Sequence, residues 1–125
     1  MLGRYTMHRG KKPTVIGVRM DTRKHTRHCL RPAAEMVVRY LAGDPTYPWN
    51  SFRKDYEKLV AKRFQDDRRP FDLLAERARH EDIFLGCSCP TKKNPDVYHC
   101  HTVLALKFMK DTYPDLSVVM PEREV

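Results

Sequence analysis

The order of apolar and polar positions along the chain predicts both strands and helices. Residues 13–20, PTVIGVRM, form a short run rich in β-branched residues, which is typical of a buried strand. DIFLGCSC at 82–89, which stops at Pro90, and LSVVMP at 116–121 predict two further strands. In the segments between these runs the spacing of apolar residues changes to the three and four residues of a helix.

Four helices are predicted in these segments: residues 31–43, a helix starting at Trp49, residues 70–81 and residues 99–111. The second helix carries one continuous apolar stripe, formed by Phe52, Tyr56, Leu59, Val60 and Phe64. Trp49, Phe52 and Tyr56 could also stack on bases, but their helical spacing favours packing in a core.

This order predicts a small three-layer α/β domain with a short, mainly parallel sheet, in the order strand–helices–strand–helix–strand. Residues 1–125 form one domain by size, and residues 1–12 are predicted to be a flexible basic segment. In open α/β sheets, ligands bind beyond the carboxyl ends of the strands, so the segments that follow 13–20 and 82–89 are the first places to look for a site.

Composition supports a folded chain: 41% of the 125 residues are hydrophobic and 32% are charged. A chain of this length buries a sufficient core without a disulfide or a metal. No apolar run is long enough to cross a bilayer, and the N-terminus lacks the apolar core of a signal peptide, so we expect a cytoplasmic protein without a membrane partner. In that compartment the four cysteines are expected to be reduced thiols or metal ligands.

The positive charge is concentrated near the N-terminus. Residues 1–31 hold nine Lys and Arg residues against one Asp, so this quarter accounts for the whole formal net charge of +8. Such asymmetry favours a polyanionic partner, either nucleic acid or a phosphorylated ligand, and the alternative is a solvated basic surface. The candidates for substrate or anion binding are Arg23, Lys24, Arg27 and Arg31.

Residues 86–110 contain a cluster of possible metal ligands. Cys87, Cys89, Cys100 and His101 form one candidate set for zinc, with His99 beside them. The Cys-x-Cys spacing is unusual for structural zinc, because residues two apart on a strand lie roughly 6–7 Å from each other. The chain would have to leave strand geometry before Cys89, and Pro90 allows that.

The same residues also suit nucleophilic chemistry. Cys100 is predicted in the first turn of the last helix, where unpaired N–H groups and the helix dipole stabilise a thiolate. Cys100 is then the candidate nucleophile, and His101 is its base or orienting group. Cys87 and Cys89 could act as resolving thiols, a phosphate could bind at the same helix terminus, or the cysteines could simply be packed in the core.

A second cysteine-containing segment follows the first predicted strand. HTRHC at 25–29 holds Cys29 between basic residues, with His25 and His28 close by in sequence. In a parallel sheet this loop would lie at the same edge as Cys100, where it could complete a metal or catalytic site. The alternative, which we favour slightly, is a mobile basic loop.

The chain resembles the uncharacterised YeaO-like family over roughly residues 13–120. The resemblance is carried by WNSFRKDYEKL at 49–59, by LRPAAEMVVRYLAG at 30–43, and by an apolar strand that ends in cysteine before CHTVLAL at 100–106. It implies a compact α/β domain of unsettled biochemistry. On the family's motif, Cys87 or Cys89, Cys100 and His101 are the matching positions.

Two functions remain open from the sequence. The first is a small enzyme that uses a Cys/His site at a helix N-terminus on a phosphorylated or nucleic-acid-related substrate. The second is a nucleic-acid or nucleotide binding module with a structural or metal-binding Cys/His cluster. The sequence favours the first and does not predict the reaction or the oligomeric state.

Overall fold

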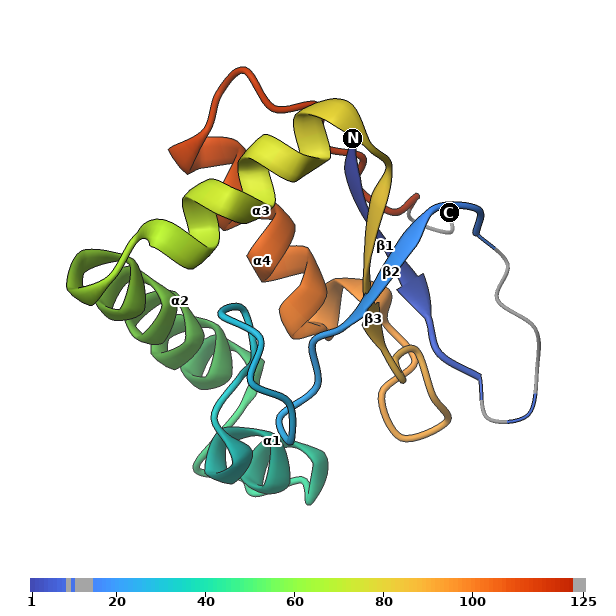
Figure 1. Ribbon diagram of the computed structural model, residues 1–125. Coiled ribbons are helices and arrows are strands. Elements are labelled where there is room, and N and C mark those ends of the chain that lie inside the picture. Colours follow the sequence, from blue (N-terminus) through green and yellow to red (C-terminus); the bar gives the residue numbers. More distant parts are fainter. Residues whose placement is uncertain (9, 11–14, 123–125) are drawn as a thin grey trace.

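The centre of the fold is a three-stranded parallel sheet (Figure 1). The computed structural model describes residues 1–8, 10 and 15–122. The strands are β1 (Leu2–Thr6), β2 (Val18–Asp21) and β3 (Ile83–Cys87), in the order β1-β3-β2, so β3 is paired on both sides. Because all three strands run in the same direction, Thr6, Asp21 and Cys87 end at one edge of the sheet.

Two predictions at the ends of the chain were wrong. Residues 2–6 are not a flexible segment: they form β1, and Leu2 is completely buried. Residues 116–121 do not form a strand, because their only sheet pairing is the isolated bridge between Leu2 and Val118. Of the predicted strand at 13–20, residues 18–20 belong to β2, and residues 13 and 14 lie outside the described part, as do 9, 11 and 12.

The four predicted helices are present. They are α1 (Ala34–Leu41), α2 (Trp49–Asp66), α3 (Arg69–His80) and α4 (His101–Thr112), and a short 3-10 turn, η1 (Val97–His99), precedes the last of them. The apolar stripe of α2 forms part of the core, since Phe52, Tyr56 and Val60 are buried. Helix α1 ends before Gly43, whose φ of 74° lies in the left-handed region that glycine adopts without strain.

The layers follow from how completely each helix is buried. Helix α4 is buried from His101 to Leu106 and packs against β1 and β3 on one side and against α2 on the other. Helix α1 in turn packs against α2. The sheet, α4 and α2 therefore form successive layers, with the helices on one side of the sheet in Figure 1. This arrangement confirms the predicted α/β class.

Among the described residues, no helix combines the length and the apolar character that crossing a bilayer requires.

Candidate functional site

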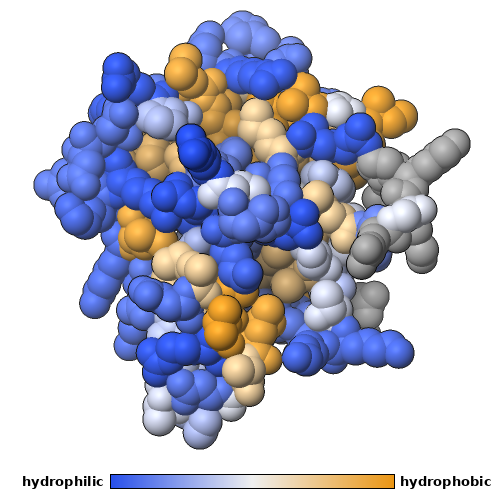
Figure 2. All heavy atoms as spheres, turned by 60° about the horizontal axis from the view of Figure 1, so that its bottom comes forward, coloured by the Kyte–Doolittle hydropathy of each residue, from blue (hydrophilic) through white to orange (hydrophobic). Residues whose placement is uncertain are grey.

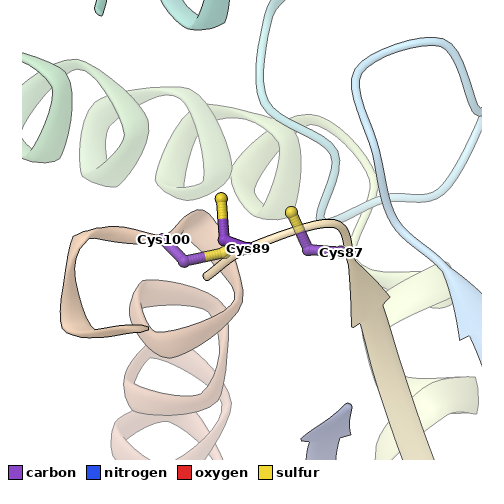
Figure 3. Close-up of side chains that lie close together, drawn as sticks. All are labelled: Cys87, Cys89 and Cys100. Carbon is purple, nitrogen blue, oxygen red and sulfur yellow. The ribbon is translucent and has the colours of Figure 1, made fainter. Parts of the chain in front are cut away.

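Three thiols meet at the carboxyl edge of the sheet. Cys87 ends β3, Cys89 lies two residues further on, and Cys100 precedes α4. Their three sulfur atoms all lie within 4.8 Å of one another. Figure 3 shows the Cys100 side chain pointing toward Cys89, with Cys87 beside them at the end of the strand. Sequence segments eleven or more residues apart thus form one compact cluster.

The strand β1 helps to fix the segment that carries Cys89. Arg4 donates one hydrogen bond from Nη2 to the carbonyl oxygen of Cys89 (2.6 Å) and another from Nε to the hydroxyl of Thr102 (2.8 Å). The Thr6 hydroxyl donates to the same Cys89 carbonyl (2.9 Å). Because β3 ends at Cys87, Cys89 has left strand geometry, which is what the Cys-x-Cys spacing requires for the sulfurs to approach.

Polar side chains donate hydrogen bonds to two of the sulfurs. Asn94 Nδ2 lies 3.4 Å from Cys89 Sγ and also donates to the His99 carbonyl (2.6 Å). The Tyr40 hydroxyl donates to Asn94 Oδ1 (3.2 Å), which holds the amide in this orientation. The Thr102 hydroxyl donates to Cys100 Sγ at 3.2 Å. Such donors stabilise negative charge on sulfur.

One thiolate, on Cys89, is the charge state that this cluster favours. Hydrogen bonds from Cys100 and Cys87, followed by that from Asn94, hold the pKa of Cys89 below the ordinary thiol value. The pKa of Cys87 is raised, because its thiol is hydrogen-bonded to Cys100 and Cys89 and is buried. Cys89 is also the most exposed of the three, as Cys87 and Cys100 are 8% and 3% exposed.

His101 is a buried, neutral imidazole beneath the cluster. Its Nε2 lies 2.8 Å from the Thr22 hydroxyl, which donates its own hydrogen to the Gly86 carbonyl (3.0 Å). Nε2 must therefore carry the proton, and Nδ1, 3.9 Å from Cys100 Sγ, is left with a lone pair facing that thiol. Burial lowers the pKa of His101 to about 4. His101 is thus neutral near pH 7, and its Nδ1 packs against the sulfur of Cys100.

The cluster opens into a pocket of about 310 Å³ at the carboxyl edge of the sheet. Figure 2 looks onto this edge, where hydrophilic side chains cover much of the surface and hydrophobic ones show between them. The loop after β2 contributes Arg23, Lys24 and His25, and the loop after β3 contributes Lys93. Among the described residues, no Asp or Glu lines the pocket. The described lining thus combines basic side chains with thiols and apolar residues.

The structure brings together most, but not all, of the residues singled out in the sequence. Cys87, Cys89, Cys100, His101, Arg23 and Lys24 all line the pocket. Arg27 and Arg31 do not line it: Arg27 is exposed, and Arg31 donates to the His28 carbonyl at 3.1 Å.

Cys29 lies outside the thiol cluster, although its neighbour His25 lines the pocket. The Cys29 sulfur is half-buried, and burial raises its pKa to about 11. Cys29 therefore remains a protonated thiol near neutral pH and completes neither a metal site nor the cysteine cluster.

One local prediction needs correction. Cys100 is not in the first turn of α4 but is its N-cap residue, with an extended backbone (φ −131°, ψ 143°). The sequence analysis also missed Arg4, Thr22, Asn94 and Thr102, which hold the cluster through hydrogen bonds. Arg4 was missed because residues 1–12 were predicted to be a flexible segment. Thr22, Asn94 and Thr102 belong to no sequence motif that indicates such a role.

The three sulfurs could hold a metal ion. In tetrahedral zinc sites a Zn–S bond of about 2.3 Å places the sulfurs roughly 3.8 Å apart, which is compatible with their mutual approach here. His101, predicted as the fourth ligand, is not part of the close group, and its Nε2 is occupied by Thr22. The described residues therefore supply three thiol ligands.

These features define a small α/β protein with a cysteine pocket at the carboxyl edge of a parallel sheet. A family model described as the active DUF488-N3 subclade matches residues 10–112, and the chain belongs to this family of unknown function. YeaO is a DUF488 member, so the match confirms the resemblance found in the sequence. Neither a curated protein nor a solved structure matches the chain.

Proposed function

We propose that this protein is a cytoplasmic thiol-dependent enzyme that acts on a phosphorylated or nucleic-acid-related substrate. The observation that carries the proposal is the convergence of three thiols on a pocket with basic side chains and no acidic ones in its described lining. The description of the matching family as an active subclade agrees with an enzyme.

The attacking group in this proposal is the Cys89 thiolate rather than Cys100. Cys89 is the most exposed sulfur of the cluster and the one whose pKa is lowered by hydrogen bonds from Cys100 and Cys87. Its sulfur donates an electron pair to an electrophilic atom of the substrate to form a new bond, and the leaving group departs with the electron pair of the bond that breaks. A neighbouring thiol, Cys87 or Cys100, supplies the proton that neutralises the leaving group.

Cys100 and His101 then act together beneath the nucleophile. His101 Nδ1 lies against the Cys100 sulfur at 3.9 Å, while the single S–H proton of Cys100 is donated to Cys89. The Nε2 contact with Thr22 fixes the ring orientation and the tautomer. His101 is therefore a positioning residue for Cys100, and Cys100 is the hydrogen-bond donor for Cys89.

The reactivity of Cys89 tests this function directly. We expect iodoacetamide to alkylate Cys89 at least tenfold faster than Cys29 at pH 7, because the pKa of Cys89 is lowered and that of Cys29 is raised to about 11. Mass spectrometry of the cysteine peptides across pH gives the rate at each position. The midpoint of the Cys89 profile should lie below pH 7.

Variants at Cys100 test whether its hydrogen bond lowers the pKa of Cys89, as distinct from a general loss of the fold. Cys100→Ala removes the hydrogen-bond donor and should move the Cys89 midpoint upward by a unit or more, whereas Cys100→Ser keeps a donor and should move it less. Cys29→Ser should leave the Cys89 profile unchanged. A Cys89 midpoint at pH 8 or above in the unmodified chain would overturn the thiolate assignment.

The mutual approach of the sulfurs favours one second candidate, a nucleic-acid or nucleotide binding module with zinc held by Cys87, Cys89 and Cys100. Elemental analysis of protein purified without chelators distinguishes the two. Stoichiometric zinc, lost in Cys87→Ser and accompanied by slow alkylation of Cys89, supports the module. Metal-free protein with fast alkylation supports the enzyme.

A further inference from the structure

We propose that the pocket binds a small aromatic phosphate, of about the size of a nucleoside monophosphate, rather than a segment of a nucleic-acid chain. This inference rests on the proposed function and names the substrate class of that site. It is carried by the two kinds of side chain that line the pocket, basic and aromatic, and by the volume of the pocket.

The basic wall has two lysines available to bind phosphate. Arg23 is partly neutralised, because its Nε and Nη2 donate to the two carboxylate oxygens of Asp21 at 3.0 and 2.9 Å. Lys24 and Lys93 are exposed, and neither forms an ion pair with a described residue. They come from two different loops that border the same pocket. A phosphate between them would gain two charge-assisted contacts.

A second wall, formed by residues of α1 and α2, is apolar and aromatic. Helix α1 contributes Val37, Tyr40 and Leu41, and α2 contributes Phe52. The Tyr40 and Phe52 rings contact each other at a centroid distance of 5.5 Å and are tilted by 45°. Because Phe52 is buried in the core, the half-buried Tyr40 is the ring whose surface a ligand can contact. A planar ring packed on this surface gains stacking and burial that inorganic phosphate lacks.

The thiols line the same pocket, and its volume limits what can reach them. A pocket of about 310 Å³ is at the small end of the range that holds individual ligands. A continuous strand of nucleic acid needs a basic groove that extends over several nucleotides, yet Arg27 and Arg31 lie outside this pocket. The dimensions therefore favour a single nucleotide-sized molecule.

Binding can be measured with the Cys89→Ser variant, in which the proposed chemistry is blocked and the pocket walls are retained. Trp49 is the single tryptophan of the chain and stacks on His99, a pocket residue, at a centroid distance of 4.9 Å, so its fluorescence reports on the site. The probes are the four nucleoside monophosphates, the matching nucleosides, inorganic phosphate and a 12-nucleotide single strand. We expect at least one monophosphate to bind tenfold or more tightly than its nucleoside and than inorganic phosphate.

Variants of each wall give a matched test. Lys24→Ala with Lys93→Ala should weaken monophosphate binding at least fivefold, whereas Lys110→Ala, in the exposed last turn of α4, should change it less than twofold. Tyr40→Leu should weaken the monophosphate at least fivefold but leave inorganic phosphate unchanged within twofold. Tyr40→Phe, which keeps the ring, should retain monophosphate binding within threefold.

The proposal is overturned if no monophosphate binds saturably, if the single strand binds tighter per molecule than every monophosphate, or if the double lysine variant binds like the unmodified chain. These outcomes are separate from those that test the enzyme. Rapid alkylation of Cys89 together with any of these three binding results would contradict the assigned substrate class but still support the thiol function. Slow alkylation of Cys89 together with tight monophosphate binding would contradict the thiol function and support the assigned ligand class.

Discussion

The His101 imidazole combines a fixed orientation with a neutral charge state, and both follow from its burial. The imidazole is 5% exposed and lies between Thr22 and Cys100. A charged imidazole at this position would lose its hydration, and for this reason burial lowers the pKa of His101 to about 4. The folded state therefore favours the neutral ring in the tautomer that the Thr22 contact requires.

This lowered pKa predicts a loss of stability in acid. The unfolded chain takes up a proton on His101 near pH 6.5, while the folded chain resists protonation until about pH 4. The stabilisation is complete above pH 6.5 and is lost as the pH falls toward 4. Between pH 6.5 and 4.5 the free energy of unfolding should fall by about 2 kcal/mol through this residue. Urea unfolding at several pH values measures the change.

The control for this prediction is His101→Gln, which cannot titrate and should show a correspondingly flatter pH dependence. His28 is also half-buried with a lowered pKa, but it is present in both proteins and its contribution cancels in the comparison. An NMR titration of the unmodified chain should show His101 still neutral at pH 5. Equal pH dependence in the two proteins would contradict the assignment.

At the level of single residues, the sequence predicted which cysteines lie close together but not the contacts that hold them. The thiols and His101 stood out because cysteine and histidine are concentrated in one short segment. Their roles depend on long-range contacts, such as that of Arg4 with the Cys89 carbonyl, 85 residues away. No local pattern records such a contact, and so the sequence placed the nucleophile on Cys100 from helix position alone.

Among the elements, the pairing of β1 with β3 is set by close contacts around a glycine. Gly86 pairs with Tyr5 across the two strands, and the Tyr5 ring and the Met7 sulfur cover its Cα. A Cβ atom added at Gly86 would lie 2.8 Å from Tyr5 Cε1 and 2.9 Å from Met7 Sδ. The absence of a side chain therefore permits the buried Tyr5 ring to pack on the central strand.

Gly86→Ala should destabilise the fold by about 1–3 kcal/mol, because the Tyr5 ring must move out of its packed position. Gly3→Ala is the matched control on the neighbouring strand: its Cβ would meet Met1 Sδ and Phe84 Cδ1 at 3.4 Å, an ordinary contact distance. We expect Gly3→Ala to change the free energy of unfolding by less than about 1 kcal/mol. Denaturant midpoints compare the two, and equal losses of stability would contradict this account.

The elements show where periodicity is informative. Helix α2 was predictable because it buries a face with regular apolar spacing, formed by Phe52, Tyr56 and Val60. The strand β1 was not, since LGRYT contains a glycine and an arginine and has the composition of a loop. It becomes a strand through pairing with β3, a tertiary effect that outweighs local propensity. The opposite error occurred at 116–121, where an apolar run makes only a single bridge.

Over the whole molecule, the basic charge is distributed between the pocket and the surrounding surface. Lys24 borders the pocket, whereas Arg19 and Arg27 are exposed and do not line it. Arg4, counted in the sequence as part of the same basic segment, points inward and holds the Cys89 and Thr102 positions. The charge asymmetry of the sequence thus includes residues with distinct structural roles, which composition alone could not separate.

Because the pocket and the outer surface carry different basic residues, we expect salt and mutations to change the affinities for an oligonucleotide and for a nucleoside monophosphate differently. A single-stranded oligonucleotide that contacts the outer basic surface should lose affinity with salt, and Arg27→Ala should reduce the slope of log affinity against log salt concentration by about 0.7, the value for one phosphate contact. The same variant should leave nucleoside monophosphate affinity within twofold, because Arg27 does not line the pocket. Titrations from 50 to 200 mM salt measure both responses. If Arg27→Ala weakened the two ligands equally, the pocket and the outer surface would be one binding site, and the division of charge described here would be wrong.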